Sequence, residues 1–252
     1  MKSKYKNLFD LTDKVAIVTG ASKGIGASIA KAFAEFGANV VVSSRSQEGV
    51  DKVVSEITAD GYNAISCVCH VGEDDQLKNL IETTINKYGR IDILVNNAGI
   101  NPVLDRLENA DEKLFNKILD INTKSPFKLS NLVFNYMKEN KSGTIINISS
   151  IEANKPDKGL GVYSISKAAI SMLTKSQAKE WGKYGVRSNA ICPGLIKTKL
   201  SSALWQNEEM LETWLGDLPI RRPGDPDEIS GIALYLASEA SSYTTGETFN
   251  ID

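Results

Sequence analysis

Histidine and cysteine are scarce in this chain of 252 residues, which has one histidine, His70, and three cysteines. A Ser-His-Asp nucleophile needs a histidine as its general base, so the single histidine excludes most sites of that kind. Cys67 and Cys69 are two positions apart in an apolar run, and no C-x-x-C pair accompanies them to complete a zinc site. We expect no metal centre and interpret Cys67, Cys69 and Cys192 as reduced, structural thiols of a cytoplasmic protein.

An excess of charge of one sign and long apolar runs are also missing. The chain has 29 basic and 31 acidic residues, a net charge of −2, and both signs are scattered along it. Such a balance gives no indication of a nucleic-acid or membrane-surface partner. No apolar stretch approaches the roughly 20 residues that cross a membrane, and the lysine-rich segment Met1 to Thr12 lacks the apolar core of a signal peptide. We therefore expect neither nucleic acid nor a membrane as a partner.

Short apolar runs alternate with longer amphipathic stretches along the whole chain. The apolar runs predict strands at Val15–Thr19, Asn39–Ser43, Ala64–Val68, Ile91–Val95, Thr144–Ser149, Arg187–Ile191 and Glu247–Ile251. The stretches between them predict helices at Ile25–Phe36, Gln47–Ala59, Asp74–Tyr88, Asp111–Leu119, Ser125–Lys138, Tyr163–Lys183 and Pro226–Leu236. Runs such as Val40-Val41-Val42 are apolar on both faces, which is typical of a parallel sheet covered by helices on both sides. The pattern predicts one α/β domain over residues 1–252, with a Rossmann-like, doubly wound parallel sheet of about seven strands.

A glycine-rich turn follows the first predicted strand, in the segment Thr19-Gly20-Ala21-Ser22-Lys23-Gly24-Ile25-Gly26. Glycine allows a tight strand-to-helix turn and a close approach of the backbone to a pyrophosphate. The helix that follows offers free N–H groups and the positive end of its dipole to phosphates. The spacing differs from the G-x-G-x-x-G of the two-halved dinucleotide fold, and a plain structural turn is the alternative interpretation.

The spacing T-G-x-x-x-G-x-G resembles instead that of the short-chain dehydrogenase/reductase family. Further motifs match this family in order along nearly the whole chain: Asn96-Asn97-Ala98-Gly99, Asn122, Ser150, Tyr163 with Lys167, and Pro193-Gly194 followed by Thr198. The resemblance, strongest to the NADPH-dependent carbonyl and retinal reductases, implies an enzyme that moves a hydride between a nicotinamide cofactor and a carbonyl or alcohol carbon. It assigns cofactor contacts to Gly20, Ser22, Lys23, Gly24, Ile25, Gly26, Asn96, Ala98, Gly99, Tyr163, Lys167, Pro193, Gly194, Ile196 and Thr198.

The end of the second predicted strand bears on which nicotinamide cofactor is used. Enzymes that select NAD usually carry an acidic residue there, which binds the ribose 2′-hydroxyl. This strand instead ends Val42-Ser43-Ser44-Arg45-Ser46, without a carboxylate. Arg45 can hold a 2′-phosphate in a bidentate fashion, with Ser44 and Lys23 nearby, although an ordinary solvated arginine is the alternative. We predict NADP(H) as the cofactor. At His70 the family commonly has an aspartate, and we assign His70 no role.

Tyr163 and Lys167 are four residues apart, so they lie on one face of a helix. Free tyrosine has a pKa of about 10, and a nearby ammonium together with an oxidised nicotinamide favours the phenolate, so we expect a pKa near 7. The resemblance implies that Tyr163 protonates the carbonyl oxygen while NADPH gives hydride to the carbon. It also implies that Ser150 polarises this oxygen and that Asn122 holds a water that relays protons to Lys167.

Other features leave alternatives open. Leu200–Leu215 carries leucine and tryptophan at helical spacing, which fits either the mobile lid of the family or ordinary core packing. The alternative functions are a 3-oxoacyl-carrier-protein reductase, a sugar or polyol dehydrogenase, and a catalytically silent NADP(H)-binding sensor. The resemblance further implies a homotetramer that pairs through the predicted helices Ser125–Lys138 and Tyr163–Lys183. Candidate substrate-pocket residues are Val103, Glu152, Asn154 and Leu160.

Overall fold

A computed structural model, which describes residues 5–102, 104–217 and 219–252, contains a parallel sheet of seven strands. Their order across the sheet is β3-β2-β1-β4-β5-β6-β7, so the chain runs outward from β1 in one direction and then in the other. The bounds are β1 Val15–Thr19, β2 Asn39–Ser44, β3 Ala64–Val68, β4 Ile93–Asn96, β5 Gly143–Ile148, β6 Val186–Pro193 and β7 Thr248–Ile251. The predicted fold class, a Rossmann-like parallel sheet flanked by helices, is confirmed.

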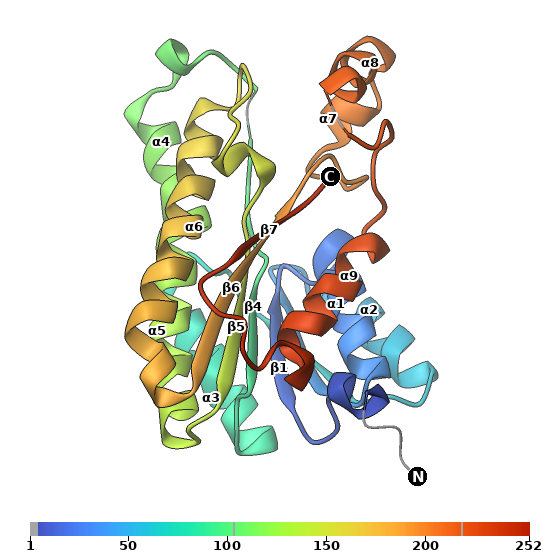
Figure 1. Cartoon of the computed structure of the whole chain (residues 1–252), viewed down its shortest axis with the longest axis vertical. Coiled ribbons are helices and arrows are strands. Elements are labelled where there is room, and N and C mark those ends of the chain that lie inside the picture. Colours follow the sequence, from blue (N-terminus) through green and yellow to red (C-terminus); the bar gives the residue numbers. More distant parts are fainter. Residues whose placement is uncertain (1–4, 103, 218) are drawn as a thin grey trace.

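Helices cover both faces of this sheet, with α1, α2 and α9 on one face and α3, α5 and α6 on the other (Figure 1). Short 3₁₀ turns link several of them. The helix bounds are α1 Gly24–Glu35, α2 Gln47–Ala59, α3 Asp74–Tyr88, α4 Glu112–Leu119, α5 Ser125–Glu139, α6 Gly161–Trp181, α7 Ser202–Trp205, α8 Glu208–Asp217 and α9 Asp227–Ala237. The segment Leu200–Leu215 thus contributes α7 and α8.

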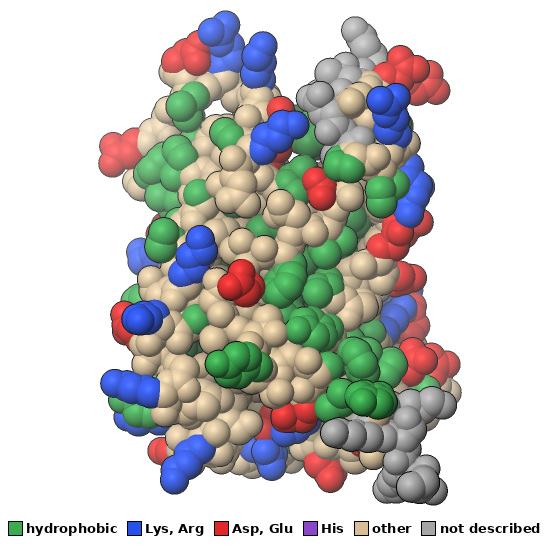
Figure 2. Space-filling view, viewed as in Figure 1, with side chains coloured by type: hydrophobic (Ala, Val, Ile, Leu, Met, Phe, Trp, Pro, Cys, Tyr) green, Lys and Arg blue, Asp and Glu red, His purple; other side chains and the backbone are tan. Residues whose placement is uncertain are grey.

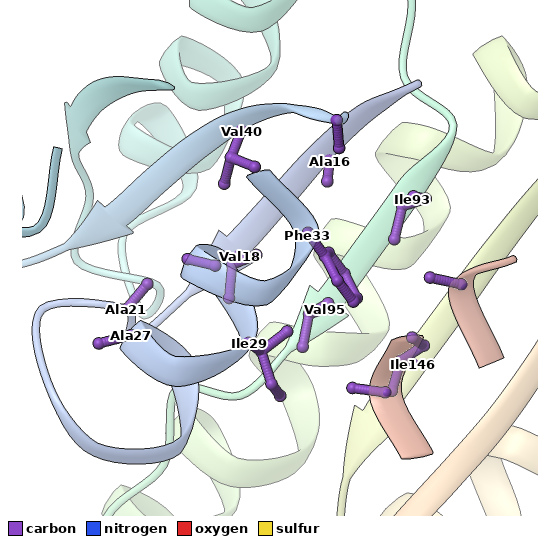
Figure 3. Close-up of a cluster of buried hydrophobic side chains, with 14 of the residues drawn as sticks. Ala16, Val18, Ala21, Ala27, Ile29, Phe33, Val40, Ile93, Val95 and Ile146 are labelled. Carbon is purple, nitrogen blue, oxygen red and sulfur yellow. The ribbon is translucent and has the colours of Figure 1, made fainter. Parts of the chain in front are cut away.

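Alternation along the strands divides the core into two layers. Ile17 of β1 belongs to the buried cluster beneath α3 and α5, whereas its neighbours Ala16 and Val18 belong to the cluster beneath α1 and α9. In Figure 3, Ile29 and Phe33 of α1 lie over this second set of strand side chains, and both are fully buried. Two-sided burial explains why the strands are apolar at consecutive positions.

The prediction differs from the structure where the polypeptide is locally irregular. β4 begins at Ile93 rather than Ile91, and the carboxylate of the preceding Asp92 accepts a hydrogen bond from the Val15 N–H at 2.9 Å. A π-helical turn over Asp120–Lys124 joins α4 to α5, although the sequence pattern predicts two separate helices. Pro126 has no N–H to donate to the carbonyl four residues earlier, which disfavours regular α-helix at this point.

Candidate active site

The carboxyl ends of the strands open into a hollow. Figure 2 shows the surface indented between the arm that carries α4 and the arm that carries α7 and α8, and β7 ends at the base of this indentation. A pocket of about 400 Å³ lies at this end, bordered by Tyr163 and the residues just before it, by Asn101, by the segment from Asp105 to Asp111, and by α4. Ligands of open α/β sheets bind at this edge.

The glycine turn between β1 and α1 is fastened to the end of β4. Gly20 and Gly24 have φ values of +64° and +58°, a region that favours glycine. The Asn97 side-chain amide donates to the backbone oxygens of Thr19 at 2.8 Å and of Gly20 at 3.2 Å. A Cβ built at Gly26 would lie 2.4 Å from the same amide nitrogen. Positive φ values at Gly20 and Gly24 and the close packing at Gly26 therefore account for these three glycines.

Asn97 holds the turn, a role that the sequence motif alone did not reveal, whereas the Asn96 side chain faces another part of the molecule. Asn96 is 5% exposed, and its amide donates to Asn147 Oδ1 at 2.8 Å and to the Ser130 hydroxyl at 3.0 Å. The Asn147 amide in turn donates to the Thr174 hydroxyl at 2.9 Å and to Gln177 Oε1 at 3.2 Å. The Asn96 side chain thus belongs to a buried polar network between the sheet and α5 and α6. The cofactor contact predicted for Asn96 therefore cannot involve this side-chain amide, which is bonded within the protein.

The start of α1 fits the phosphates of a dinucleotide. Lys23 is the N-cap residue and makes no side-chain capping bond, and the first turn contains no acidic residue, so no carboxylate opposes an anion. A Cβ at Gly24 would lie 3.2 Å from the methyl carbon of Thr198, which places the segment after β6 directly over the turn. Other residues predicted to contact the cofactor lie in the same segment. Pro193 ends β6, the Gly194 N–H donates to Ile251 O, and Ile196 pairs with Gly224 in an isolated β-bridge.

The end of β2 lies beside this turn. The Ala21 N–H donates to Ser43 O at 2.9 Å, and a Cβ at Gly49, in the first turn of α2, would lie 2.8 Å from Ser22 Cβ. Arg45 is exposed and, within the described residues, forms no ion pair. Lys23 is likewise exposed. These two side chains are thus available to an anionic ligand bound at the end of β2.

Helix α6 carries Tyr163 and Lys167 on the face that meets β5. Lys167 is 5% exposed, and its Nζ donates to Ile148 O at 2.8 Å and lies 5.6 Å from the centre of the Tyr163 ring. Burial lowers the pKa of Lys167 to about 8. A Cβ built at Gly99 would lie 3.5 Å from this Nζ, an ordinary contact distance, so the loop after β4 passes beside the amine.

The pKa of Tyr163 differs from the expectation. Burial raises it to about 12, a hydrogen bond with the Ser150 hydroxyl opposes the rise, and the negative charge of Glu152 adds to it. The protein groups alone therefore do not give Tyr163 a pKa near 7. That expectation included the charge of Lys167 but not the desolvation of the phenol. At pH 7 the phenol therefore carries its proton.

Ser150 follows β5 and begins a 3₁₀ turn over Ile151–Ala153. Its Oγ accepts a hydrogen bond from the Glu152 N–H at 3.2 Å, which leaves the hydroxyl proton to donate. Ser149, the adjacent serine, is instead bonded to Lys167 O at 2.9 Å. The structure thus brings Ser150, rather than Ser149, together with Tyr163.

Asn122 lies in the π-helical turn and is 1% exposed. Its side-chain oxygen accepts from the Ile100 N–H at 2.8 Å, and its amide donates to Ile100 O at 2.9 Å and to the Ser166 hydroxyl at 3.0 Å. The side chain therefore fixes the loop after β4 against α6. The role of Asn122 in holding a water stays a prediction.

Several other predicted features also have a definite position. The Trp205 indole N–H donates to Thr198 O at 3.1 Å, so α7 is tied to the segment over the glycine turn. Leu160 is buried immediately before α6, and Asn154 is exposed. Val103 lies outside the described residues. None of the described helices combines the length and apolar character needed to cross a membrane. In the described part of the chain, no three His, Cys, Asp or Glu side chains are grouped to hold a metal ion.

A helix-flanked parallel sheet with a glycine turn, a half-buried tyrosine and a buried lysine at one edge is typical of the class of nicotinamide-dependent oxidoreductases. Residues 20–252 match the family model described as Enoyl-(Acyl carrier protein) reductase. The chain is 43% identical over 238 residues to Dehydrogenase/reductase SDR family member 4 of Oryctolagus cuniculus, a match that covers 94% of this chain and 92% of that protein. The human member 4 is 41% identical, with 94% and 86% covered. This chain belongs to the short-chain dehydrogenase/reductase family.

Solved structures of the family have the same fold. A gluconate 5-dehydrogenase from Burkholderia cenocepacia in complex with NADP and tartrate has a TM-score of 0.93 and 31% identity, covering 98% of this chain and 96% of that chain. A 7α-hydroxysteroid dehydrogenase complexed with NADH and 7-oxo glycochenodeoxycholic acid has a TM-score of 0.93 and 36% identity, with 98% and 95% covered. The predicted family and enzyme class are confirmed: the chain is an NAD(P)-dependent oxidoreductase that acts on CH–OH or C=O groups.

Proposed function

We propose that this enzyme reduces ketones or aldehydes with NADPH and, in reverse, oxidises secondary alcohols. The observation that carries the proposal is the grouping of Ser150, Tyr163 and Lys167 beside the glycine turn, at the edge of the sheet where ligands bind. A silent binding protein has no need of this combination. We further propose that residues 1–252 act as one NADP(H)-binding domain.

The preference for NADP(H) over NAD(H) rests on the end of β2. Arg45 and Lys23 are exposed, and no carboxylate occurs from Ser43 to Gln47 that would repel a 2′-phosphate. The gluconate 5-dehydrogenase with the same fold is described with NADP, whereas the hydroxysteroid dehydrogenase is described with NADH, so the family fold accepts either. The proposed cofactor contacts are Gly20, Ser22, Lys23, Gly24, Ile25, Gly26, Ser44, Arg45, Ala98, Gly99, Tyr163, Lys167, Pro193, Gly194, Ile196 and Thr198, with Asn96 restricted to its backbone.

The protein residues divide the proton chemistry among them. When bound, a reduced nicotinamide supplies the hydride for the carbonyl carbon. Ser150 donates a hydrogen bond to the carbonyl oxygen and stabilises the charge that develops there. Tyr163 donates its proton to that oxygen, which its raised pKa permits because the phenol is neutral at pH 7. Lys167 stabilises the Tyr163 phenolate that remains. Asn122 holds the water through which a proton is returned by way of Lys167.

A panel of ketones and aldehydes tests the proposal, with the loss of NADPH absorbance followed over time and NADH run in parallel. The expected result is consumption of NADPH with at least one carbonyl compound and a higher kcat/KM with NADPH than with NADH. Binding of NADPH without turnover of any compound would identify a sensor, and equal or better use of NADH would refute the cofactor preference.

A polyol or sugar dehydrogenase is the second candidate, and the likeness to gluconate 5-dehydrogenases favours it over a 3-oxoacyl-carrier-protein reductase. Each of these enzymes would use the same catalytic residues. The carbonyl panel therefore includes a ketose and a 3-oxoacyl thioester, and the compound with the highest kcat/KM decides among them.

We also propose a homotetramer, as the family resemblance implies. Phe127 of α5 and Ile165 and Met172 of α6 are large apolar residues that are 49%, 44% and 61% exposed. Apolar side chains exposed on neighbouring helices support an interface between subunits. Light scattering in solution should give about four times the chain mass of 27.4 kDa, and a monomer would refute this assembly.

A further inference from the structure

The chain leaves the sheet after β6 and returns to the body of the molecule at Gly224, and the arm between these points carries α7 and α8 (Figure 1). The base of the arm is fixed by two backbone bonds, from the Lys197 N–H to Gly224 O at 2.8 Å and from the Gly224 N–H to Leu195 O at 2.8 Å. A Cβ built at Gly224 would lie 2.7 Å from Ile196 Cδ1, so the two segments are closely packed there.

Thr198 is the first residue of the arm and touches the glycine turn. A Cβ built at Gly24 would lie 3.2 Å from Thr198 Cγ2 and 3.5 Å from Thr198 Cβ. Gly24 is the first residue of α1, at the end of the helix that suits phosphates. A diphosphate bound at this end of α1 therefore lies beside Thr198.

Two side chains of the arm hold Thr198 in this place. The Ser201 Oγ accepts from the Thr198 N–H at 3.2 Å and lies 3.1 Å from the Thr198 Oγ1, which closes a short local turn. The Trp205 indole N–H, seven positions along the chain, donates to the Thr198 carbonyl oxygen at 3.1 Å. Because a peptide unit is planar, the bond from Trp205 restricts the whole peptide unit between Thr198 and Lys199.

Trp205 is the last residue of α7, and its side chain is half-buried. An indole N–H is a donor only, so the acceptor that it meets determines how the ring is oriented. This acceptor is the carbonyl oxygen of Thr198. A displacement of Thr198 is therefore passed through the indole to α7, and a displacement of α7 is passed to Thr198.

We propose that Trp205 is a positioning residue that holds Thr198 beside the phosphates of the cofactor and links the binding of NADP(H) to the position of α7. This inference rests on the proposed function, which assigns Thr198 to the cofactor. Linkage between binding events is reciprocal, and the arm that carries α7 borders the hollow for the carbonyl compound (Figure 2). The cofactor and the carbonyl compound therefore favour each other's binding.

The first test measures the affinity for 2′-phospho-ADP-ribose, the part of NADP without its nicotinamide, by titration calorimetry. Trp205→Phe keeps an aromatic ring but removes the indole N–H, and it should raise the Kd about 3- to 10-fold, the range expected for one neutral hydrogen bond. It should also raise the KM of the carbonyl compound and change kcat less than either constant. Trp214→Phe makes the same replacement in α8 and is the matched control, with the Kd of the wild type.

The second test uses the fluorescence of Trp205 itself. The chain has three tryptophans, and the third, Trp181, stacks on Phe134 with ring centres 4.3 Å apart at the far end of α6. A protein with Trp181→Phe and Trp214→Phe reports Trp205 alone. Addition of 2′-phospho-ADP-ribose should shift its emission with the Kd obtained by calorimetry. If this double variant does not fold, calorimetry of the two single variants decides.

The outcomes separate positioning from a purely structural role. A Trp205→Phe variant with a lower Tm but the wild-type Kd would overturn the inference, and so would an equal rise of Kd in Trp214→Phe. An emission of Trp205 that does not respond to the ligand would also overturn it. A wild-type protein that consumes no NADPH with any carbonyl compound would instead refute the proposed function. The Kd values need no turnover, so they would still decide the role of Trp205.

Discussion

Replacement of Gly26 by alanine tests whether the glycine turn is held by the end of β4. Gly26 is in the first turn of α1 and is not among the glycines with positive φ, so alanine can adopt its backbone conformation. In an open helical position, alanine is favoured over glycine by about 1 kcal/mol. Here, however, a Cβ would lie 2.4 Å from Asn97 Nδ2 and 2.7 Å from Gly20 O, far inside the usual contact distance of about 3.5–4.0 Å.

The size of the effect follows from what must move. The Asn97 amide cannot withdraw without loss of its hydrogen bonds to Thr19 O and Gly20 O, and the Gly20 oxygen belongs to the turn itself. Overpacking costs about 1–3 kcal/mol, and a lost hydrogen bond adds about 1 kcal/mol. We expect Gly26→Ala to lower the free energy of unfolding by about 2–4 kcal/mol, which lowers Tm by about 5–15 °C in a chain of this size.

Denaturant and thermal unfolding measure this loss, and fluorescence titration with NADPH measures the Kd, which should rise because the turn is displaced. Gly231→Ala in α9 is the matched control, since a Cβ there has no atom within 4 Å. It should raise stability by up to about 1 kcal/mol. A Gly26→Ala variant with the wild-type Tm and Kd would show that the contact with Asn97 does not restrict position 26. An increase of Tm in both variants would show the same.

Three further predictions concern the catalytic and cofactor residues. Tyr163→Phe should lower kcat about 10²- to 10⁴-fold with an unchanged Kd for NADPH, and kcat above a tenth of wild type would remove Tyr163 from the mechanism. Arg45→Ala should reduce the kcat/KM preference for NADPH over NADH about 10- to 100-fold, and an unchanged preference would make Arg45 a bystander. Because burial lowers the pKa of Lys167 from 10.5 to about 8, the unfolded state binds a proton between these values that the folded state lacks. Wild-type stability relative to Lys167→Met should therefore rise between pH 7 and pH 10, by up to about 3 kcal/mol, whereas a constant difference in denaturant unfolding would contradict this.

Most of the fold was predictable because the strands are buried on both faces and the helices are amphipathic. The predicted bounds of β1, β3, α2 and α3 agree with the structure residue for residue. The π-helical turn over Asp120–Lys124 was not predicted, since hydrophobic periodicity shows only that the apolar pattern is interrupted there. Pro126 was a signal for it, because its missing N–H removes the partner of the Asn122 carbonyl.

The site was predictable as a set of residues but not in all of its contacts. Asn96 and Asn97 are two consecutive asparagines, and the motif alone does not indicate which side chain faces the glycine turn. The alternation of side chains along a strand does indicate it. Asn96 is on the same face of β4 as Leu94, whose side chain is in the cluster beneath α3 and α5. The raised pKa of Tyr163 could not be obtained from sequence, because desolvation depends on how completely the folded chain surrounds the phenol.

The polar network around Asn147 makes the layer between the sheet and α5 and α6 less tolerant of single substitutions than the layer beneath α1. Asn147 accepts from Asn96 and donates to Thr174 and Gln177, so one hydrogen-bond network joins β4, β5 and α6. An aliphatic residue at Asn147 would remove one hydrogen bond each from Asn96, Thr174 and Gln177 at once, whereas a substitution in the layer beneath α1 only has to conserve volume. Variation at these four positions must therefore be concerted, and a library that randomises them together will yield folded proteins that single replacements cannot reach.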